Sequence, residues 1–388
     1  MLINLRNALM AGKRLPYDAE VEYLESTGTQ YVDTGYSFNS ATDSVELVFE
    51  LLTTTPNFKW IFGAYDASKR LAIGSGDGVN RRTLGYNAST SYNSSTYYTD
   101  SAHIFLADSA GASIDGHNFF AFADFSTTSH IILYSIPIDL STYCANARIW
   151  SYKHYRNGVL VRDYIPVRVG TVGYMYDRVS GKLFGNAGTG DFVLGPDVVP
   201  VEYIESHGTE YIDVGPIVGA DEVIVKLSAS SIPSSGCYKA FGVGYTSNFS
   251  DDFGINSSGW CGQSYAPVSL DTQSTARMSQ SGRFIDDKNL GGSSSLFFTK
   301  VAAGNRLFLF CGTNGSSAYI TGSGNYMAWR GRFYSCVVSS SGNKMFDHLP
   351  VRVGTEGAMM DVLTHHIYRN AGTGAFTYGN DLKYPIPA

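Results

Sequence analysis

The chain has 388 residues, of which 44% are hydrophobic and 16% are charged. This length suits two domains of ordinary size, and the hydrophobic share is that of a folded protein rather than a disordered one. The net charge of −6 offers no basic surface to nucleic acid, and no run of about 18 apolar residues is present to span a membrane. We therefore expect neither nucleic acid nor a membrane as a partner.

The first element in chain order is an amphipathic helix over residues 2–12. Leu2, Leu5 and Leu9 share one helical face, and Gly12 suits the C-terminal cap. Polar residues interrupt the apolar run, so the segment does not have the pattern of a signal peptide. A helix this short is marginal in isolation. We therefore predict that residues 1–17 anchor or oligomerise the protein, as a docking helix and a linker.

The next element is a motif that occurs twice, as VEYLESTGTQYVDTG at 21–35 and VEYIESHGTEYIDVG at 201–215. A second pair of motifs closes each copy: PVRVGT with NAGTG at 166–171 and 186–190, and again at 350–355 and 370–374. The first motif is displaced by 201 − 21 = 180 residues and the closing one by 350 − 166 = 184. The sequence therefore predicts two tandem copies of one domain, at 18–196 and 197–388.

Short strands fill the first copy. Val45, Leu47, Phe49 and Leu51 alternate with polar residues, which is the pattern of a half-buried strand. Asn157-Gly158 predicts a tight hairpin, and Ser180-Gly181 predicts another. Gly, Asn and Ser clusters separate the strands and leave no room for a helix of normal length. The expected fold is a two-sheet antiparallel sandwich.

A tyrosine-rich stretch follows within the first copy, between the shared motifs. It contains Tyr86, Tyr92, Tyr97 and Tyr98, spaced by small polar residues without hydrophobic alternation. Tyrosine with Ser and Asn is typical of binding surfaces, because rings stack while amides and hydroxyls form hydrogen bonds. The alternative is a solvated strand–loop edge. In the second copy Trp260 and Tyr265 are the corresponding candidates, in a region that has diverged from the first.

Residue patterns for catalysis and metal binding are weak. Glu22 and Glu25 recur in both copies, but their spacing of three puts them on opposite faces of a strand, whereas a glycosidase needs two carboxylates on one face. The adjacent pair His365-His366 would diverge in a strand, which disfavours zinc. Asp251-Asp252 and Asp286-Asp287 suit Ca²⁺ less well than they suit solvated loops. We expect no enzyme activity, no metal and no cofactor.

Two further sets of residues have structural interpretations. Asp33 and Asp213 precede Gly35 and Gly215, so each carboxylate is predicted to hold a turn by a backbone hydrogen bond. The five cysteines follow no disulfide pattern and no Cys-x-x-Cys motif. We interpret them as mostly buried, reduced thiols, in a protein that is assembled inside a cell.

The motifs at 22–35, 148–155, 162–171 and 175–190 resemble those of the concanavalin A-like, laminin-G-like jelly-roll modules of phage structural proteins and gut-bacterial surface proteins. Both copies carry the resemblance, which covers nearly the whole chain apart from the amino-terminal arm. It implies an all-β fold of two antiparallel jelly rolls. It also implies glycan recognition on a virion or cell surface, and it implies no catalytic residue.

The sequence thus leads to one functional hypothesis and two alternatives. The expected protein is a phage tail or head fibre, adhesin or decoration subunit that is assembled in the bacterial cytoplasm and displayed on the virion surface. Its partners would be host-surface glycan, further copies of itself, and other virion proteins that contact residues 2–12. The alternatives are a purely architectural virion subunit and a bacterial cell-surface carbohydrate-binding protein.

Overall fold

The structure is a computed structural model that describes residues 15–52, 59–66, 69–75, 82–86, 90–94, 102–120, 125–246, 249–261, 264–291, 306–314, 317–319 and 326–382. Every regular element in these ranges is a β-strand. The helix predicted over residues 2–12 lies outside them. The chain divides into two compact units, Arg14–Val198 and Val199–Ala388, called here the N-terminal and C-terminal units. The boundaries expected at residues 17 and 196 stay predictions.

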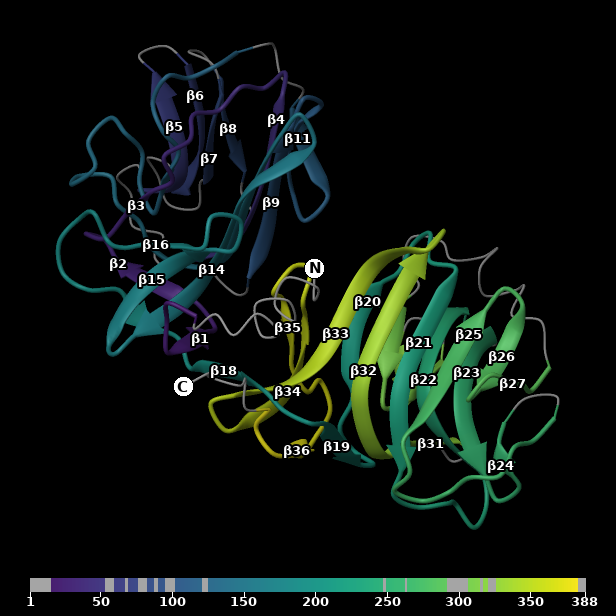
Figure 1. The fold of residues 1–388 in the computed structure, drawn as a ribbon. Coiled ribbons are helices and arrows are strands. Elements are labelled where there is room, and N and C mark those ends of the chain that lie inside the picture. Colours follow the sequence, from purple (N-terminus) through teal and green to yellow (C-terminus); the bar gives the residue numbers. More distant parts are fainter. Residues whose placement is uncertain are drawn as a thin grey trace. The chain divides into compact units, whose positions relative to one another are not determined.

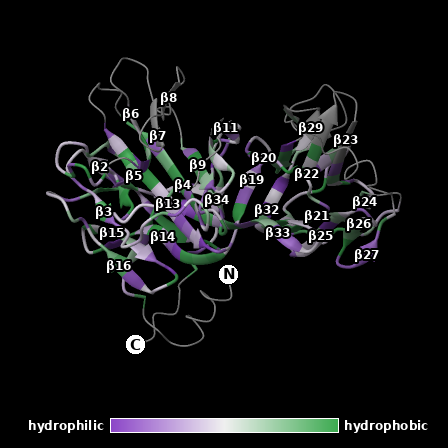
Figure 2. Ribbon diagram, turned by 90° about the horizontal axis from the view of Figure 1, so that it is seen from above, coloured by the Kyte–Doolittle hydropathy of each residue, from purple (hydrophilic) through white to green (hydrophobic). Residues whose placement is uncertain are grey.

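The larger sheet of the N-terminal unit is built around β4, labelled in Figure 1, and β13, labelled in Figure 2. The β4 strand pairs antiparallel with β9 on one side and β13 on the other, and β13 continues to β2 and β14. The strands of this sheet are β1 (Ala19–Val21), β2 (Leu24–Thr27), β4 (Asp43–Leu51), β9 (His103–Asp108), β10 (Gly111–Ile114), β11 (His117–Phe120), β13 (Asn146–Arg156), β14 (Val159–Val169), β15 (Val172–Asp177), β16 (Lys182–Phe184), β17 (Val193–Leu194) and β18 (Asp197–Pro200).

A second sheet covers the apolar face of the first. Its strands follow the order β3 (Val32–Asp33), β12 (Ile132–Leu133), β5 (Trp60–Asp66), β6 (Lys69–Ser75), β7 (Arg82–Tyr86) and β8 (Thr90–Ser94). The ring of Phe62 on β5 lies 5.7 Å from that of Phe105 and 6.0 Å from that of Tyr152, both on the larger sheet. The unit is therefore a sandwich of two antiparallel sheets.

The C-terminal unit repeats this plan. One sheet contains β19 (Ile204–His207), β21 (Glu222–Ala229), β25 (Ser274–Ser279), β26 (Gly282–Ile285), β27 (Lys288–Asn289), β32 (Arg330–Ser340), β33 (Asn343–Val353), β34 (Glu356–Asp361), β35 (Ile367–Tyr368) and β36 (Thr377–Tyr378). The other contains β20 (Ile212–Pro216), β22 (Cys237–Thr246), β23 (Phe249–Asn256), β24 (Gly259–Trp260), β28 (Arg306–Leu309) and β31 (Tyr326–Ala328). A separate hairpin pairs β29 (Gly312–Asn314) with β30 (Ser317–Tyr319). The all-β, antiparallel class predicted from the sequence is confirmed for the described residues, with β22–β31 as a parallel pair.

Alternating hydrophobicity sets the strand faces, and Figure 2 shows hydrophobic and hydrophilic colours alternating along the strands. Val45, Leu47, Phe49 and Leu51 of β4 all lie in the core, as the period-two pattern predicts. In the C-terminal unit the ring of Phe310 stacks 3.9 Å from that of Phe333 on the facing sheet. Burial of these side chains stabilises each sandwich by about 1.5–3 kcal/mol for each large residue.

The two units share a β-bulge in their central strands. Trp150 is left out of the β13–β4 pairing, and Tyr334 is left out of the β32–β21 pairing, 184 residues later. The same registers pair Val45 with His154 and Val223 with Val338. Val45 therefore corresponds to Val223, a displacement of 178. The displacement of 180 residues between the two opening motifs therefore does not extend to these strands, because loop lengths differ before β4 and β21.

The turns confirm several predictions from the sequence. The amide of Gly35 donates to Asp33 Oδ1 at 2.8 Å, and the amide of Gly215 donates to Asp213 Oδ1 at 3.0 Å. Asn157 and Gly158 join β13 to β14 with φ of 50° and 73°, which is the left-handed region that an Asn-Gly turn supplies. These contacts fix the ends of the strands, whereas the apolar alternation decides which of their side chains are buried.

Candidate functional site

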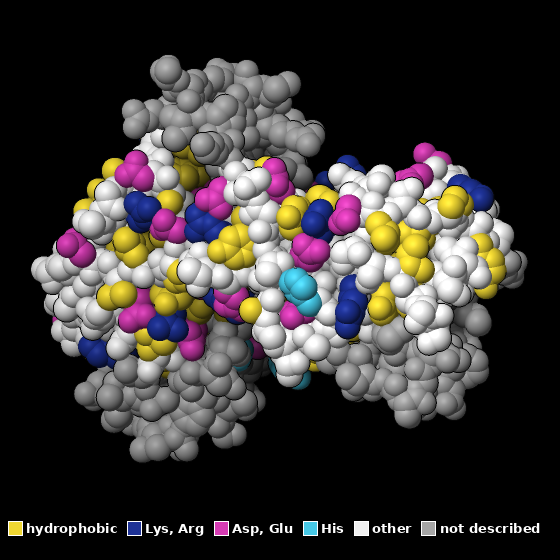
Figure 3. Space-filling model, turned by 90° about the horizontal axis from the view of Figure 1, so that it is seen from below, with side chains coloured by type: hydrophobic (Ala, Val, Ile, Leu, Met, Phe, Trp, Pro, Cys, Tyr) yellow, Lys and Arg dark blue, Asp and Glu magenta, His cyan; other side chains and the backbone are white. Residues whose placement is uncertain are grey.

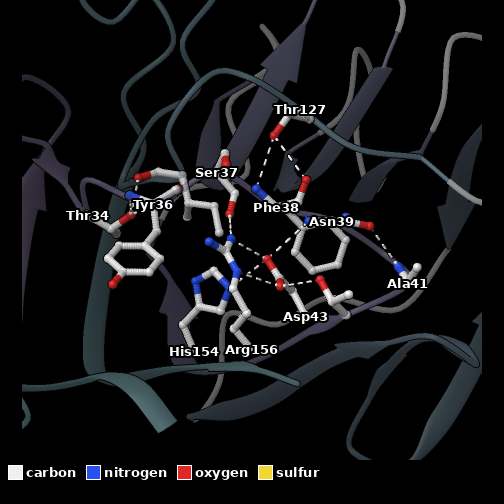
Figure 4. A network of polar contacts seen from close by, with 12 residues as sticks. Thr34, Tyr36, Ser37, Phe38, Asn39, Ala41, Asp43, Thr127, His154 and Arg156 are labelled. Carbon is white, nitrogen blue, oxygen red and sulfur yellow. Dashed lines mark hydrogen bonds and ion pairs between the residues drawn. The ribbon is translucent and has the colours of Figure 1, made fainter. Parts of the chain in front are cut away.

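A buried polar network lies where β4 begins and β13 ends (Figure 4). His154 Nε2 lies 3.0 Å from Asp43 Oδ2, and Arg156 donates to both oxygens of the same carboxylate at 2.9 and 2.8 Å. The side chains of Asp43 and His154 are fully buried. Arg156 also donates to the Ser37 carbonyl at 2.9 Å, so the network fastens the segment before β4 to the end of β13.

The network has the residue types of an acid–base relay. Tyr152 and His154 approach at 3.3 Å, so a neutral imidazole accepts a hydrogen bond from the tyrosine hydroxyl at Nδ1 and donates one from Nε2 to Asp43. Burial lowers the pKa of His154, which keeps the ring neutral. Burial also raises the pKa of Asp43, but hydrogen bonds from Arg156, Thr42 and His154 lower it by more, so the carboxylate stays ionised. Every group is engaged within the protein, so the network serves the fold.

A different set of side chains lies on the face of the N-terminal sheet that points away from the core. We call it the N-terminal outer-face cluster: Tyr23, Glu25, Glu50, Arg148 and Trp150. Arg148 donates to Glu25 at 2.8 Å and to Glu50 at 3.3 Å. Its guanidinium carbon lies 4.5 Å from the centre of the Tyr23 ring, and that ring lies 5.4 Å from the Trp150 ring.

The bulge explains why these side chains meet. Ile149 and Tyr152 both lie in the core, although a spacing of three would put them on opposite faces of a regular strand. The extra residue in the bulge, Trp150, shifts the alternation of faces by one position. Its side chain projects beside Arg148 on the other face. The neighbouring strand β2 supplies Glu25, whose backbone pairs directly with Arg148.

The C-terminal unit builds a matching cluster from Tyr203, Glu205, Asp271, Arg332 and Tyr334, called here the C-terminal outer-face cluster. Arg332 Nε donates to Glu205 at 3.1 Å, and its guanidinium carbon lies 4.6 Å from the centre of the Tyr203 ring. The Tyr203 and Tyr334 rings lie 5.8 Å apart at 68°, against 60° for the first pair. Tyr334 thus replaces Trp150 at the bulge, and the arginine is present in both units.

One position beside the arginine changes between the units. Glu50 pairs with Arg148, whereas Ser228 pairs with Arg332 in the same register. Ser228 is buried, and its hydroxyl lies 3.3 Å from that of Tyr334. Asp271 replaces the lost carboxylate from a loop, 3.6 Å from Arg332, with more than half of its side chain exposed. The two clusters therefore present similar rings beside different hydrogen-bonding groups.

Both clusters combine ring surface with fixed polar groups. The charged side chains of the first cluster are between 13% and 31% exposed, so they are held in place yet reach solvent. Burial raises the pKa of Tyr23, so its hydroxyl stays protonated and can donate a hydrogen bond at neutral pH. Such a surface suits a ligand with an apolar patch ringed by hydroxyls.

On the face of the molecule shown in Figure 3, Lys and Arg side chains lie close to Asp and Glu side chains. This is the same mixing of charges that the ion pairs of the two clusters display. A mixed surface does not select for polyanions, which require clustered positive charge.

The sequence-predicted tyrosines are placed only in part. Tyr86 ends β7 and Tyr92 lies in β8, where β8 is the outermost strand of its sheet, and the structure describes their backbone alone. Tyr97 and Tyr98 lie outside the described residues. Tyr265 is 51% exposed, as a ligand-binding ring requires. These predictions remain open.

Trp260 requires a correction. Its side chain is 3% exposed and packs in the core, with its ring 5.8 Å from both Trp329 and Phe253. The ring is buried because Trp260 belongs to β24, which pairs with Ile255 of β23 and turns its side chain inward. It therefore offers no surface to a glycan.

Sequence reasoning missed Tyr23 and Trp150. Both lie in segments shared by the two copies, whereas the candidate rings were taken from the stretches between the shared motifs. The signal was available in the alternation itself, because Tyr23 and Glu25 flank the fully buried Leu24 and so belong to the opposite face. The bulge at Trp150 depends on pairing with a distant strand and leaves no sequence signal.

Two of the acidic candidates for Ca²⁺, Asp252 and Asp286, have partners within the protein. Asp252 lies 3.7 Å from Lys239 Nζ, and Asp286 accepts the amide of Thr275 at 2.7 Å. In the part of the chain that the structure describes, no group of three or more His, Cys, Asp or Glu residues is placed to hold a metal ion. Nor do the described residues include a helix long and apolar enough to cross a membrane.

Comparisons with known proteins give little further information. No protein-family model matches the sequence, and no curated protein matches it. Among solved structures, the chain is similar to the mouse laminin alpha1 chain, domains LG4-5, with 10% sequence identity and a TM-score of 0.30 over 85% of this chain and 92% of that chain. That TM-score is too low to support an argument, so the fold class rests on the strand pairing described above.

Proposed function

We propose that this chain is a non-enzymatic glycan-binding protein whose two related β-sandwich units each bind sugar at the outer-face cluster. The observation that carries the proposal is the recurrence of the cluster in both units, with the ring pair and the arginine–glutamate pair kept. Pyranose rings present C–H groups to aromatic faces, while their hydroxyls accept from guanidinium and donate to carboxylate.

The charges of the clusters point to a class of sugar. The N-terminal cluster has one arginine and two glutamates, and the C-terminal cluster has one arginine, one glutamate and one aspartate. Each sums to −1. Neutral or amino sugars therefore suit the surface better than sialic acids or sulfated chains, whose charge each cluster would repel.

The paired carboxylates also argue for binding rather than hydrolysis. A glycosidase needs one carboxylic acid that is placed to protonate the glycosidic oxygen. Glu25 and Glu205 are instead each engaged by a hydrogen bond from the guanidinium of the neighbouring arginine. We therefore propose that the protein has no hydrolase activity.

The biological setting of the proposal rests on the sequence motifs alone. Their resemblance to phage structural modules supports a tail or head fibre, adhesin or decoration subunit on the virion surface, assembled in the bacterial cytoplasm. Residues 2–12 would attach the protein to other virion proteins or to further copies of itself. Weak single sites then become effective through many copies on one particle.

The test is a glycan array probed with the full chain in multivalent form, alongside the Tyr23→Ala, Tyr203→Ala double variant. Binding of a neutral or amino sugar that the double variant loses supports the proposal. A chain that binds no sugar, or that binds equally well without both rings, overturns it. In that case an architectural role gains support, and a chain lacking residues 1–15 that still folds but no longer enters particles would establish the anchor.

A further inference from the structure

Two of the five cysteines lie next to each other in the second sheet of the C-terminal unit. Cys237 is the first residue of β22, and Cys261 directly follows β24. Their Sγ atoms are 3.6 Å apart, although the residues are 24 positions apart in the chain. Both are free thiols. Cys237 is 8% exposed and Cys261 is more accessible, so a small reagent meets Cys261 first.

Gly254 lies beside the pair and permits close packing of the backbones of β22 and β23. Gly254 lies on β23, between the two cysteine-bearing segments: it pairs with Lys239 on one side and accepts the amide of Cys261 at 2.9 Å on the other. A Cβ on this residue would lie 2.1 Å from the Tyr238 carbonyl oxygen. The backbones of β22 and β23 are thus packed too closely at this point for a side chain on residue 254.

The charges around the pair distinguish the two sulfurs. The Cys237 thiol donates a hydrogen bond to Cys261 and lowers the pKa of Cys261 to about 7, with Lys239 and Arg283 acting in the same direction against burial. That same hydrogen bond and burial raise the pKa of Cys237, and Asp252 contributes in the same sense. Cys261 is therefore the nucleophile of the pair and Cys237 the resolving thiol.

We propose that Cys237 and Cys261 form a redox-active dithiol that a small-molecule disulfide, such as oxidised glutathione, converts to an intramolecular disulfide. The Cys261 thiolate attacks one sulfur of the reagent and releases one glutathione thiolate, which takes up a proton. Cys237 then loses its proton and attacks Cys261 Sγ, which breaks the mixed disulfide and releases the second glutathione. The protein loses two electrons and two protons, and the reagent gains both.

The bond requires a modest movement within the sheet. Disulfide sulfurs are about 2.0 Å apart, so the pair must close by about 1.5 Å from its present separation. Closure would tie the start of β22 to the end of β24 and restrict the unfolded chain between them. In a cytoplasm kept reducing by glutathione the pair stays open, whereas in oxidising surroundings outside a cell it closes. This inference is independent of sugar binding.

The test uses the purified full chain treated with oxidised or reduced glutathione at pH 8. Peptide mapping without reduction is expected to show one link, between Cys237 and Cys261, with the other three thiols free. The oxidised chain is expected to melt roughly 5–10 °C higher in the C-terminal unit. A chain that keeps both thiols free, or that forms the link only in denaturant, overturns the proposal.

Three variants separate the roles of the two sulfurs. Cys237→Ser is expected to accumulate a mixed disulfide with glutathione at Cys261, because the resolving thiol is gone. Cys261→Ser is expected to react at least about tenfold more slowly, because the remaining thiol is mostly protonated. Cys144→Ser is the matched control, since a hydroxyl can keep the hydrogen bond from residue 144 to the Leu140 carbonyl, and it should behave as wild type. Equal trapping in both of the first two variants would contradict the assignment of Cys261 as nucleophile.

Discussion

The N-terminal and C-terminal units fill the core at the end of their central strands, β13 and β32, with different types of side chain. In the first, His154 lies on the core side of β13 and is hydrogen-bonded to Asp43, whose charge Arg156 balances. In the second, the register places Val338 where His154 lies, and Val338 belongs to the apolar core. Ser340 and Asp221 stand at the positions of Arg156 and Asp43. The comparison shows that the shared bulge and turns define the fold, while this end of the core tolerates either an ionic or an apolar filling.

On the next strand, β14 in the N-terminal unit and β33 in the C-terminal unit, the C-terminal unit has the histidine. Tyr164 of the N-terminal unit is fully buried and donates to the Thr34 carbonyl at 3.2 Å. The equivalent residue, 184 positions later, is His348, which is equally buried and packs its ring against Phe346 and Tyr368. Among the described residues, each unit thus has one fully buried histidine, at a different site. These differences make the two units controls for each other.

The largest expected effect comes from removing the carboxylate of the ionic network. Asp43→Ala leaves Arg156 without its counter-charge and the buried His154 without its hydrogen-bond acceptor, and should destabilise the N-terminal unit by about 3–5 kcal/mol. The matched change is Asp221→Ala, because this carboxylate accepts an exposed hydrogen bond from the Ser341 amide. It should cost the C-terminal unit about 1 kcal/mol or less. Urea denaturation with hydrogen exchange resolved by peptide measures both, and equal losses would refute the contrast.

A pH-dependent difference should follow from His348. Burial lowers the pKa of His348 to about 4 from its ordinary 6.5, while Asp361 acts against burial and His366 with it. Because the folded pKa is the lower one, the unfolded chain takes up the proton first, and stability is lost as the pH falls from 6.5 towards 4. The loss amounts to about 3 kcal/mol.

Replacing His348 by the residue of the other unit sharpens this test. His348→Tyr should remove most of the slope of stability against pH between 6.5 and 4 in the C-terminal unit. Denaturation at several pH values, with each unit followed by its own peptides, provides the slope. An unchanged slope would mean that other groups, His366 among them, dominate the acid response of this unit.

The NAGTG turns, which both units share, should lose similar amounts of stability on substitution of the same glycine. A Cβ on Gly188 would lie 2.1 Å from the Thr29 carbonyl oxygen, and one on Gly372 would lie 2.2 Å from that of Thr209. Gly188→Ala and Gly372→Ala should therefore each cost roughly 1–3 kcal/mol, because backbone must move to admit the methyl group. Thermal unfolding measures the pair. A difference of more than about 2 kcal/mol between them would show that the turns are not equivalent.

The smallest expected effect lies in the same turn. Gln30 of the N-terminal unit accepts the Thr27 amide, and Glu210 of the C-terminal unit accepts the His207 amide in the same way. Burial raises the pKa of Glu210, but hydrogen bonds from the backbone, Ser206 and Thr209 lower it by more. The folded pKa is thus below 4.5, so this stability is present above that pH and is lost on further acidification. Between pH 6 and pH 3 the unfolding free energy should fall by about 1 kcal/mol or less through Glu210, and Glu210→Gln should abolish this fall. Denaturation of both proteins at the two pH values measures the difference.

The sequence predicts much of this fold from local patterns. Alternation placed Leu47 and Phe49 in the core, and the Asp-x-Gly motif predicted the bonds from Gly35 and Gly215. Features that join distant segments were not predictable. Asp43 and His154 are 111 residues apart, and the bulge at Trp150 exists only in the pairing with β4. Composition alone suggested Trp260 as a binding residue, because it gives no information on which face of a short strand points inward.

The central claim is that the two outer-face clusters bind sugar, and a calorimetric titration with the best glycan from the array tests it most directly. Trp150→Ala and Tyr334→Ala should each remove about half of the sites, and the double variant should lose binding while both units still unfold cooperatively. Tyr265→Ala, at an exposed ring outside the clusters, is the control. Unchanged stoichiometry and affinity in the double variant, with loss of binding in Tyr265→Ala, would contradict the account and return recognition to the loops.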